Sequence, residues 1–415
     1  MPKLEVSQPL AGGEPLCCPA LFVAAPASGQ GKTTLVAALA RLHTRQGRRV
    51  RIFKCGPDFL DPQIHAIASG APCQNLDLWM CGLDDIVWRL AEAARHADLI
   101  LIEGVMGLFD GTPSAAELSS LLGIPILAVI DGASMAASFG AIAYGLKHYR
   151  PSTLLSAAFA NRVGSAHHAS LLEKSLPADI AWFGHLARDA DTRLPERHLG
   201  LLPASEISDL TQRLDRLADR LSETSAAQLP APILFQNVPP PDEAQCLAGK
   251  TIAIARDAAF CFLYPANLQC LQRLGARLVY FSPLADPLLP ACDAVWLPGG
   301  YPELHGTQLA ANTTLWAALR AHVEQGQALL AECGGMMSLF ASLVDLEGQT
   351  FKLGGLLPGV VRMQKRLAGL GMQEVTLPEG TLRGHTFHYS STETTLAPLC
   401  ASQRPDGRPG EAIYR

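Results

Sequence analysis

The sequence predicts an α/β protein of two domains, each built around a parallel sheet. The chain has 415 residues, which is too long for one ordinary domain. Short apolar runs alternate with helical stretches up to about residue 222, and the same rhythm restarts at residue 251. Runs that are apolar on both faces are typical of parallel strands covered by helices on two sides.

The first series contains six predicted strands and a closing amphipathic helix. The strands are residues 21–25, 50–54, 99–102, 126–130, 154–159 and 180–184. The helix carries one apolar stripe, which we expect to pack against the first domain. The stripe consists of Ile207, Leu210, Leu214, Leu217 and Leu221.

A segment rich in proline and polar residues separates the two domains. We expect a flexible N-terminus over residues 1–18, a first domain over 19–222, a linker over 223–250 and a second domain over 251–415. The second domain contains predicted strands at residues 251–255, 277–281, 293–297 and 328–331. After Phe351 the pattern becomes glycine-rich, with short strands and no clear helix.

Composition excludes several classes of protein. The net charge of −5 gives no basic field for nucleic acid. No apolar run is long enough to span a membrane, and the polar start does not resemble a secretory signal. The 11 cysteines are scattered without a CxxC pair, which argues against a disulfide framework or a structural zinc site. We therefore expect a cytoplasmic protein.

A phosphate-binding turn follows the first strand. Residues 26–34 read PASGQGKTT and precede an apolar helix. Backbone N–H groups around Gly29 and Gly31, with the helix N-terminus behind them, are suited to phosphate oxygens. Lys32 is expected to reach the terminal phosphates and the Thr33 hydroxyl to bind Mg²⁺, with Thr34 beside them. Pro26 stands where such turns usually have their first glycine.

Acidic residues follow two further strands of this domain. Lys54 precedes Asp58 and Asp61, which lie between two prolines in a segment that we do not expect to be regular helix. Glu103 ends an apolar strand, and Asp110 follows in a glycine-flanked turn. Because parallel strands bring their carboxyl ends to one edge, we expect these groups to meet the phosphate-binding turn. Carboxylates there suit a metal ion or substrate, and Lys54 suits a transferring phosphate.

The second domain contains a candidate nucleophile. Cys333 follows an apolar strand and precedes Gly334 and Gly335, as in a sharp strand–turn–helix elbow. We expect the helix N-terminus to lower the pKa of the thiol. The glycine turn of PGGYPE, residues 298–303, offers N–H groups for an oxyanion hole. His385 and His388 are three apart in a strand, so only one of them faces Cys333.

Taken together, these motifs resemble the cobyrinic acid and hydrogenobyrinic acid a,c-diamide synthase family of glutamine-dependent corrinoid amidotransferases. The likeness extends over residues 19–391, and the order of the motifs is more specific than any one of them. The motifs are PASGQGKTT (26–34), KCGPDFLDPQIH (54–65), NLDLWM (75–80), EGVMGLFDG (103–111), LPERHLGL (194–201), PGGYPE (298–303), AECGGMM (331–337) and RGHTFHYS (383–390).

The resemblance implies a P-loop domain of the dethiobiotin-synthetase type, followed by a class I, triad-type glutamine amidotransferase domain. It also implies ATP- and Mg²⁺-dependent amidation of the a and c carboxylates of a corrin ring in cobalamin biosynthesis. Cys333 matches the nucleophile and His388 the histidine that activates it. The third triad residue stays unassigned, and we expect a further His-containing strand after Arg415. The resemblance also implies two sets of binding residues. The residues expected to contact the substrate are Asp58, Phe59, Leu60, Asp61 and Asp110, and those expected to bind the metal ion are Thr33, Asp58 and Glu103.

The implied chemistry joins the two domains. ATP activates a carboxylate as an acyl phosphate, Cys333 releases ammonia from glutamine, and ammonia displaces the phosphate. We expect a sheltered passage for ammonia between the domains. A corrin with many carboxylates also calls for cations, for which Arg162, Arg188, Arg193 and Arg197 are candidates. The sequence does not determine the oligomeric state, for which a homodimer is one candidate.

Three alternatives stay open. The first is another tetrapyrrole amidase, such as cobyric acid synthase or a nickel-sirohydrochlorin a,c-diamide synthase; GPDFLDP favours a,c-diamidation over the former. The second is a P-loop switch ATPase, which would need neither Cys333 nor His388 and usually has a second lysine early in its loop. The third is a carboxylase-like ligase with an inert second domain.

Overall fold

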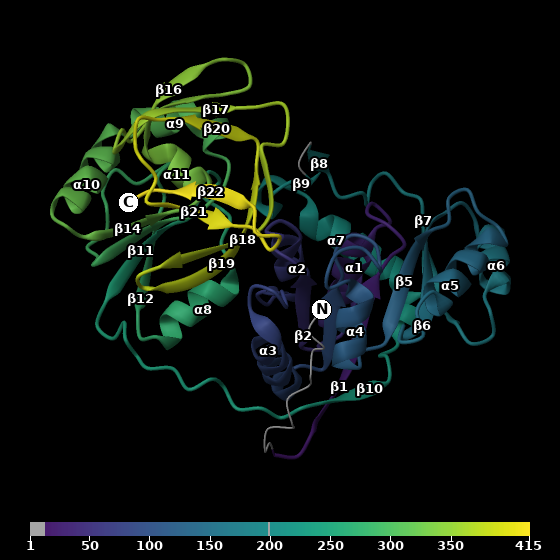
Figure 1. Cartoon of the computed structure of the whole chain (residues 1–415). Coiled ribbons are helices and arrows are strands. Elements are labelled where there is room, and N and C mark those ends of the chain that lie inside the picture. Colours follow the sequence, from purple (N-terminus) through teal and green to yellow (C-terminus); the bar gives the residue numbers. More distant parts are fainter. Residues whose placement is uncertain (1–12, 198–199) are drawn as a thin grey trace. The chain divides into compact units, whose positions relative to one another are not determined.

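The computed structural model describes residues 13–197 and 200–415. The chain separates into two compact units, Met1–Asp242 and Glu243–Arg415 (Figure 1). The division falls inside the segment 223–250 that was expected to be a linker. Each unit is an α/β structure with a parallel sheet, which confirms the predicted fold class.

The first unit is built on a sheet with strand order β3-β2-β4-β1-β5-β6-β7, in which all neighbouring strands of this path are parallel. The strands match the predicted apolar runs within a few residues, except that β3 was not predicted. Their bounds are β1 Leu16–Ala24, β2 Val50–Cys55, β3 Gln74–Leu76, β4 Leu99–Glu103, β5 Ile126–Asp131, β6 Leu155–Val163 and β7 Ala181–Ala187.

Helices cover both faces of this sheet. They are α1 Lys32–Arg45, α2 Asp61–Ser69, α3 Gly82–His96, α4 Ala115–Leu122, α5 Ser138–His148, α6 Ala166–Ser175 and α7 Leu210–Ser222. Buried residues of α1, α2 and α7 form one hydrophobic cluster, and those of α3, α4, α5 and α6 belong to another. Along β1, Ala20 and Phe22 belong to one cluster, whereas Leu21 and Val23 belong to the other. This alternation is what a sheet buried on both faces requires.

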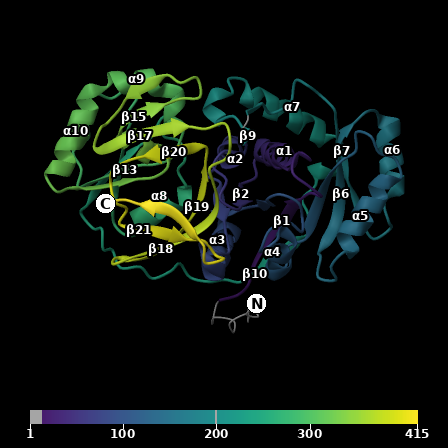
Figure 2. The same ribbon diagram turned by 45° about the horizontal axis from the view of Figure 1, so that its top comes forward.

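Helix α7 packs against α1, in line with the expected packing of the apolar stripe against the first domain (Figure 2). Ile207, which was expected in this helix, precedes it and follows a short 3-10 helix. Leu214 and Leu221 are completely buried, and Leu210 and Leu217 nearly so. Two short 3-10 helices flank α7, η1 Ala204–Glu206 and η2 Ser225–Ala227. A small hairpin precedes them, formed by β8 Glu196–Arg197 and β9 Gly200–Leu201.

The first and last described strands of this unit pair with each other. Strand β10, Pro232–Phe235, lies within the expected linker and pairs antiparallel with the start of β1, with Leu16 opposite Phe235. Of the N-terminal segment 1–18 that was expected to be flexible, residues 1–12 lie outside the described residues and Leu16 begins β1.

The second unit contains a parallel sheet of order β12-β11-β13-β14. Its strands lie where the sequence predicts them, at β11 Thr251–Ala255, β12 Arg277–Phe281, β13 Ala294–Leu297 and β14 Ala328–Ala331. Its helices are α8 Pro265–Arg273, η3 Pro302–His305, α9 Gly306–Ala311, α10 Thr313–Glu324 and α11 Gly334–Leu339. Leu315, Trp316 and Leu319 of α10 are buried in the core of this unit.

Two four-stranded sheets complete the second unit, with orders β16-β15-β17-β20 and β19-β18-β21-β22. Their strands are β15 Phe340–Val344, β16 Thr350–Lys352, β17 Leu357–Met363, β18 Gly369–Leu377, β19 Gly380–His388, β20 Ser390–Glu393, β21 Cys400–Gln403 and β22 Pro409–Ile413. In the described part of the chain, no helix has the length and apolar character needed to cross a bilayer.

Candidate active site

The turn between β1 and α1 is shaped as a phosphate-binding loop. Gly29 and Gly31 have φ angles of 76° and 96°, which favour glycine because it lacks a Cβ. The helix begins at Lys32 with Gly31 as its N-cap and no side chain capping it, so its first N–H groups stay available for an anion. Asn161 at the end of β6 donates to the Gln30 carbonyl at 2.9 Å and holds the turn from the side.

The Lys32 ammonium is turned onto backbone carbonyls. Its Nζ donates to Met106 O at 2.7 Å and to Ala27 O at 3.4 Å. Burial lowers the pKa of Lys32, and the positive charge of Lys54 acts in the same direction. Met106 has a φ of 52°, a strained value for a residue with a side chain, in the loop that follows Glu103. The predicted meeting of the phosphate-binding turn with the loop after β4 is therefore present.

Thr33, Lys54, Asp61 and Glu103 converge at the carboxyl edge of β2 and β4. The Thr33 hydroxyl donates to Glu103 Oε1 at 2.7 Å and lies 3.2 Å from Asp61 Oδ2. The Lys54 ammonium donates to Glu103 Oε1 at 2.8 Å and also forms an ion pair with Asp61. Lys54 and Glu103 are buried. A buried ion cluster of this kind is costly to desolvate, and each charge depends on its partners.

The charges in this cluster shift one another's pKa values. Burial alone would lower the pKa of Lys54, but the negative charges of Glu103 and Asp61 outweigh it and raise that pKa well above its usual value. Burial opposes ionisation of Glu103 too, yet Lys54 and a hydrogen bond from His65 hold its pKa far below normal. Burial raises the pKa of Asp61 to about 7, and the neighbouring charge of Glu103 adds to this rise.

Asp61 corrects one expectation about local structure. The segment between the two prolines was not expected to be regular helix, but Asp61 is the first residue of α2. Pro62 occupies the first turn of that helix, where a missing N–H removes no hydrogen bond. The helix start thereby carries Asp61 to Thr33 and Lys54.

Asp58 and Asp110 are bonded mainly within their own loops. Asp58 Oδ1 accepts from the Leu60 N–H at 2.9 Å, and its other oxygen lies 3.8 Å from Lys54 Nζ. Asp110 Oδ2 accepts from the Gly107 N–H at 2.9 Å, which shapes the turn beside Pro26. Phe59 is partly exposed and Leu60 is buried in the Asp58 loop.

The candidate arginines lie in different surroundings. Arg162 pairs with Asp131, donates to Gly29 O at 3.0 Å, and has a φ of 57°. It therefore braces the phosphate-binding turn. Arg188 and Arg193 are exposed, and the side chain of Arg197 lies outside the described residues.

In the second unit, Cys333 stands on a strained elbow between β14 and α11. Its φ and ψ are 46° and −115°. The following glycines are required by crowding, because a Cβ at Gly335 would lie 2.1 Å from Leu297 O, and one at Gly334 would lie 3.0 Å from Gly300 N. The elbow thus packs directly against the PGGYPE turn. This is the geometry expected for an exposed nucleophile between a strand and a helix.

The expected depression of the Cys333 pKa is wrong. The residue is open to solvent, yet the protein atoms packed around its thiol raise the pKa to about 11. A hydrogen bond from the Gly334 N–H acts in the opposite direction but does not prevail. The negative charges of Glu303, Glu332 and Glu411 add to the rise. Helix α11 has only six residues, and these effects outweigh its N-terminus.

His388 has a carboxylate partner that sequence reasoning missed. Its Nε2 lies 3.1 Å from Glu411 Oε1, and its Nδ1 lies 3.0 Å from Ser390 O. The hydrogen bond to Glu411 raises the pKa of His388 above its usual value. The negative charge of Glu411 also raises the pKa of Cys333. Glu411 therefore affects the pKa values of both Cys333 and His388, the predicted nucleophile and its base.

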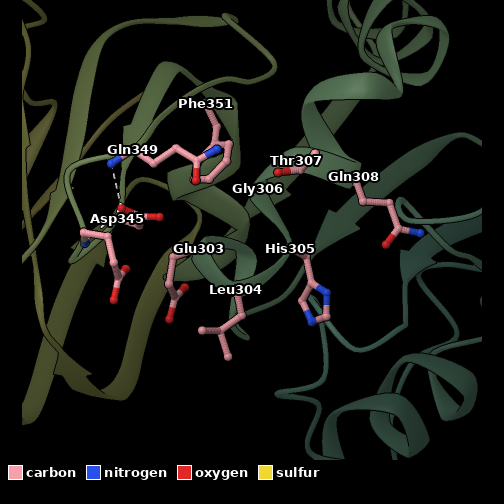
Figure 3. Close-up of a pocket in the computed structure, with 10 residues that line it drawn as sticks. Glu303, Leu304, His305, Gly306, Thr307, Gln308, Asp345, Gln349 and Phe351 are labelled. Atoms are coloured by element: carbon pink, nitrogen blue, oxygen red, sulfur yellow. Dashed lines mark hydrogen bonds between the residues drawn. The ribbon is translucent and has the colours of Figure 1, made fainter.

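A pocket of about 420 Å³ adjoins the PGGYPE turn (Figure 3). Glu303, Asp345 and Phe351 are among the residues that line it. Burial raises the pKa of Glu303 to about 7, and the charge of this residue reaches Cys333. The lining includes three carboxylates, those of Glu303, Asp345 and Glu347.

Two further residues were not assigned from the sequence. Glu411 lies 23 positions after His388, on β22 rather than β19, so no spacing linked them. His65 belongs to the KCGPDFLDPQIH motif, which does not by itself indicate a role for it; it lies four residues after Asp61, one helical turn along α2. That spacing could have placed it on the same helix face as Asp61.

Comparisons with known proteins support both halves of this description. Residues 21–202 match the model of the CobQ/CobB/MinD/ParA nucleotide binding domain. Residues 251–411 match the model of the CobB/CobQ-like glutamine amidotransferase domain.

Full-length relatives give a more specific result. The chain is 56% identical over 399 residues to the hydrogenobyrinate a,c-diamide synthase of Pseudomonas aeruginosa, covering 96% of this chain and 92% of the relative. It is 48% identical to the cobyrinate a,c-diamide synthase of Herminiimonas arsenicoxydans, over 95% and 90% of the two chains. With the cobyrinate a,c-diamide synthase of Salmonella typhimurium it shares 37% identity, over 94% and 90%. The chain therefore belongs to the family of hydrogenobyrinate and cobyrinate a,c-diamide synthases, as the order of its motifs predicted.

Proposed function

We propose that the protein is a glutamine- and ATP-dependent ligase that amidates the a and c carboxylates of hydrogenobyrinic or cobyrinic acid. The observation that supports this proposal is the presence of two candidate reactive centres in one chain. One unit gathers Lys32, Thr33, Lys54 and Glu103 around a phosphate-binding turn, and the other presents Cys333 on a nucleophile elbow. The names of the relatives supply the substrate class.

The first unit activates the carboxylate. A carboxylate is a poor electrophile, so one of its oxygens attacks the γ-phosphorus of ATP, forming an acyl phosphate and releasing ADP. Lys32 and Lys54 stabilise the negative charge on the phosphoryl group during its transfer. Lys32 is released from the carbonyls of Met106 and Ala27 when phosphates compete for its ammonium group.

The oxygen atoms at this edge fit a magnesium ion. Mg²⁺ is usually bound by one or two carboxylates together with substrate phosphates rather than by a full protein cage. We propose Thr33, Glu103 and Asp58 as ligands, with Asp61 next to Thr33. A magnesium ion held there would supply positive charge to offset the developing charge of the transferring phosphoryl group.

The second unit supplies nitrogen. The Cys333 sulfur attacks the side-chain amide of glutamine, forming a thioester and releasing ammonia; water then hydrolyses the thioester to glutamate. His388 takes the thiol proton and returns a proton to the leaving nitrogen. The PGGYPE turn offers N–H groups for the oxyanion, and the pocket beside Glu303 is our candidate for the α-amino end of glutamine. Ammonia attacks the acyl phosphate and expels phosphate, which completes the amide.

The corrinoid is proposed to lie near the loops after β2 and β4, where Asp58, Phe59, Leu60, Asp61 and Asp110 are its candidate contacts. Arg188 and Arg193 are exposed and suit further carboxylates of the macrocycle, whereas Arg162 is engaged with Asp131. A reducing cytoplasm is proposed as the site of action, because the cysteines are scattered along the sequence without a CxxC pair.

Product analysis with Cys333→Ser tests the proposal. Purified wild type and variant are incubated with ATP, Mg²⁺ and a panel of cobalt-bearing and cobalt-free a,c-dicarboxylate corrinoids, with either glutamine or ammonium chloride. We expect mass spectrometry to show diamide from both nitrogen sources with wild type. The variant should yield diamide from ammonium alone. Equal use of glutamine by both proteins would contradict the role of Cys333, and the absence of amidated corrinoid throughout would contradict the substrate.

A further inference from the structure

His65 is a buried side chain for which the proposed chemistry has no direct use. It lies on α2 and is completely buried. Its Nε2 lies 2.5 Å from Glu103 Oε2, and its own carbonyl accepts a hydrogen bond from Ser69 Oγ at 2.9 Å. The imidazole therefore touches the far oxygen of the carboxylate that faces the phosphate-binding turn.

The two oxygens of Glu103 have different partners. Oε1 accepts from Thr33 at 2.7 Å and from Lys54 at 2.8 Å, whereas Oε2 contacts His65. An ionised carboxylate can only accept hydrogen bonds, so the His65 Nε2 carries the hydrogen in this contact. Together these contacts fix the rotation of the carboxylate and direct Oε1 to the Thr33 hydroxyl.

The second ring nitrogen of His65, Nδ1, has no hydrogen-bond partner among the described residues. This nitrogen is buried. An unsatisfied buried polar atom costs free energy that an apolar side chain of similar size would avoid. Packing alone therefore does not account for a histidine here, whereas the bond to Glu103 does.

We propose that His65 is a positioning residue that holds Glu103 in the orientation required to bind a divalent cation together with nucleotide. Outer partners of metal-ligating carboxylates orient them in the same way in other metal sites. The inference rests on the proposed function only for the use of ATP with Mg²⁺; it needs neither the corrinoid nor the glutaminase reaction.

The test compares His65→Gln with His65→Met in the full chain. Glutamine keeps an N–H donor near the position of Nε2, whereas methionine fills similar space without a donor. ATP binding is measured by calorimetry without corrinoid, first in EDTA and then at increasing Mg²⁺. We expect His65→Met to raise the half-saturating Mg²⁺ concentration by about 10-fold or more while metal-free ATP affinity stays unchanged. His65→Gln should stay within about threefold of wild type.

His43→Met is the matched control, because His43 is also a buried helical histidine of the first unit, but its partner is Arg48. Its Mg²⁺ requirement should equal that of wild type. A His65→Met protein with an unchanged Mg²⁺ requirement overturns the inference, and so does a His65→Gln protein as impaired as His65→Met. If His65→Met fails to fold, His65→Gln is compared with His65→Ala instead. A wild-type Mg²⁺ requirement in His65→Gln together with a raised requirement in His65→Ala supports the inference. Equal requirements in these two variants contradict it. If His65→Met raises the Mg²⁺ requirement for ATP binding but the wild-type protein yields no amidated product, the role of His65 is supported and the proposed function is contradicted.

Discussion

His388 on β19 and Glu411 on β22 form a hydrogen-bonded pair, with 3.1 Å between Nε2 and Oε1. Gln373 Oε1 accepts from the Glu411 N–H at 2.8 Å and fixes the backbone of β22 at this point. The pair joins two strands that do not neighbour one another in the sheet. It gives the imidazole a carboxylate partner like those that orient catalytic histidines.

Replacing Glu411 by glutamine should lower glutaminase activity and alter its pH dependence. The carboxylate stabilises the protonated imidazole, so its loss lowers the pKa of His388. The neutral base then appears at lower pH, and the acidic limb of the kcat profile moves to lower pH. Loss of orientation should reduce kcat by about 10- to 100-fold, which is less than the full contribution of a general base. Glutamate release is measured between pH 5 and 9.

Glu374→Gln is the control for that experiment, because Glu374 pairs with Arg383 at 2.7 Å in the same sheet and does not contact His388 in the described structure. It should leave the pH profile in place. The orienting role of Glu411 is excluded if both variants show the wild-type profile. The His388–Glu411 pair also contributes to the free energy of unfolding, because folding raises the pKa of His388. This stabilisation is fully present at pH values below the pKa of His388 in the unfolded chain. It is lost as the pH rises through the pKa of His388 in the folded protein.

The thiol of Cys333 should be slow to alkylate at neutral pH. With a pKa of about 11, roughly one thiol in 10⁴ is ionised at pH 7, against a few per cent for an unperturbed cysteine. We expect the rate of carbamidomethylation by iodoacetamide to keep rising beyond pH 9. Peptide mass spectrometry follows this site separately from the other cysteines, and Cys333→Ser identifies the peptide. A rate that levels off below pH 8 would show that a depressed pKa, not a raised one, governs the free enzyme.

Leu214→Ala should destabilise the first unit by about 3 kcal/mol. Leu214 is completely buried between α7 and the cluster that includes α1, and leucine-to-alanine changes at such positions leave a cavity. Urea unfolding measures the loss. Arg216→Ala, two residues further along the same helix at an exposed position, should change the free energy of unfolding by less than about 0.5 kcal/mol. Similar losses in both variants would contradict the packing described for α7.

Gly31→Ala should impair nucleotide binding far more than Gly29→Ala. Both glycines have positive φ, so alanine costs about 1–2 kcal/mol of backbone strain at either position. At Gly31 the added Cβ would also lie 2.1 Å from Asn161 Nδ2, whereas at Gly29 nothing lies within 4 Å. Only Gly31→Ala must therefore displace Asn161 from the Gln30 carbonyl. ATP affinity by calorimetry checks this, and equal affinities in the two variants would refute it.

Much of the fold follows from local sequence. Strands such as Thr251–Ala255 and Arg277–Phe281 lie where their apolar runs predict, because a strand buried on both faces needs an unbroken run. The convergence of Thr33 and Glu103 follows from the parallel topology, which brings strand ends together. The flanking prolines predict a break in regular helix, but proline is well tolerated in a first turn, and the helix therefore begins at Asp61.

What the sequence did not predict depends on contacts between distant segments. Glu411 reaches His388 through the order of strands in a sheet, and a spacing of 23 residues carries no sign of it. The pKa of Cys333 depends on the protein atoms packed around the thiol of this solvent-accessible residue and on three carboxylates, two of them far away in sequence. A helix N-terminus can be identified from sequence, but the packing that opposes it cannot.

The pairing of β10 with the start of β1 has a practical consequence for dividing the gene. The first four residues of β1, from Leu16 to Pro19, have their backbone covered by Pro232–Phe235, which come after α7. A truncation placed at residue 222, just after α7, would strip that cover and leave an unpaired strand edge that invites aggregation. Anyone expressing the nucleotide-binding half by itself should therefore retain the chain through Phe235 at least.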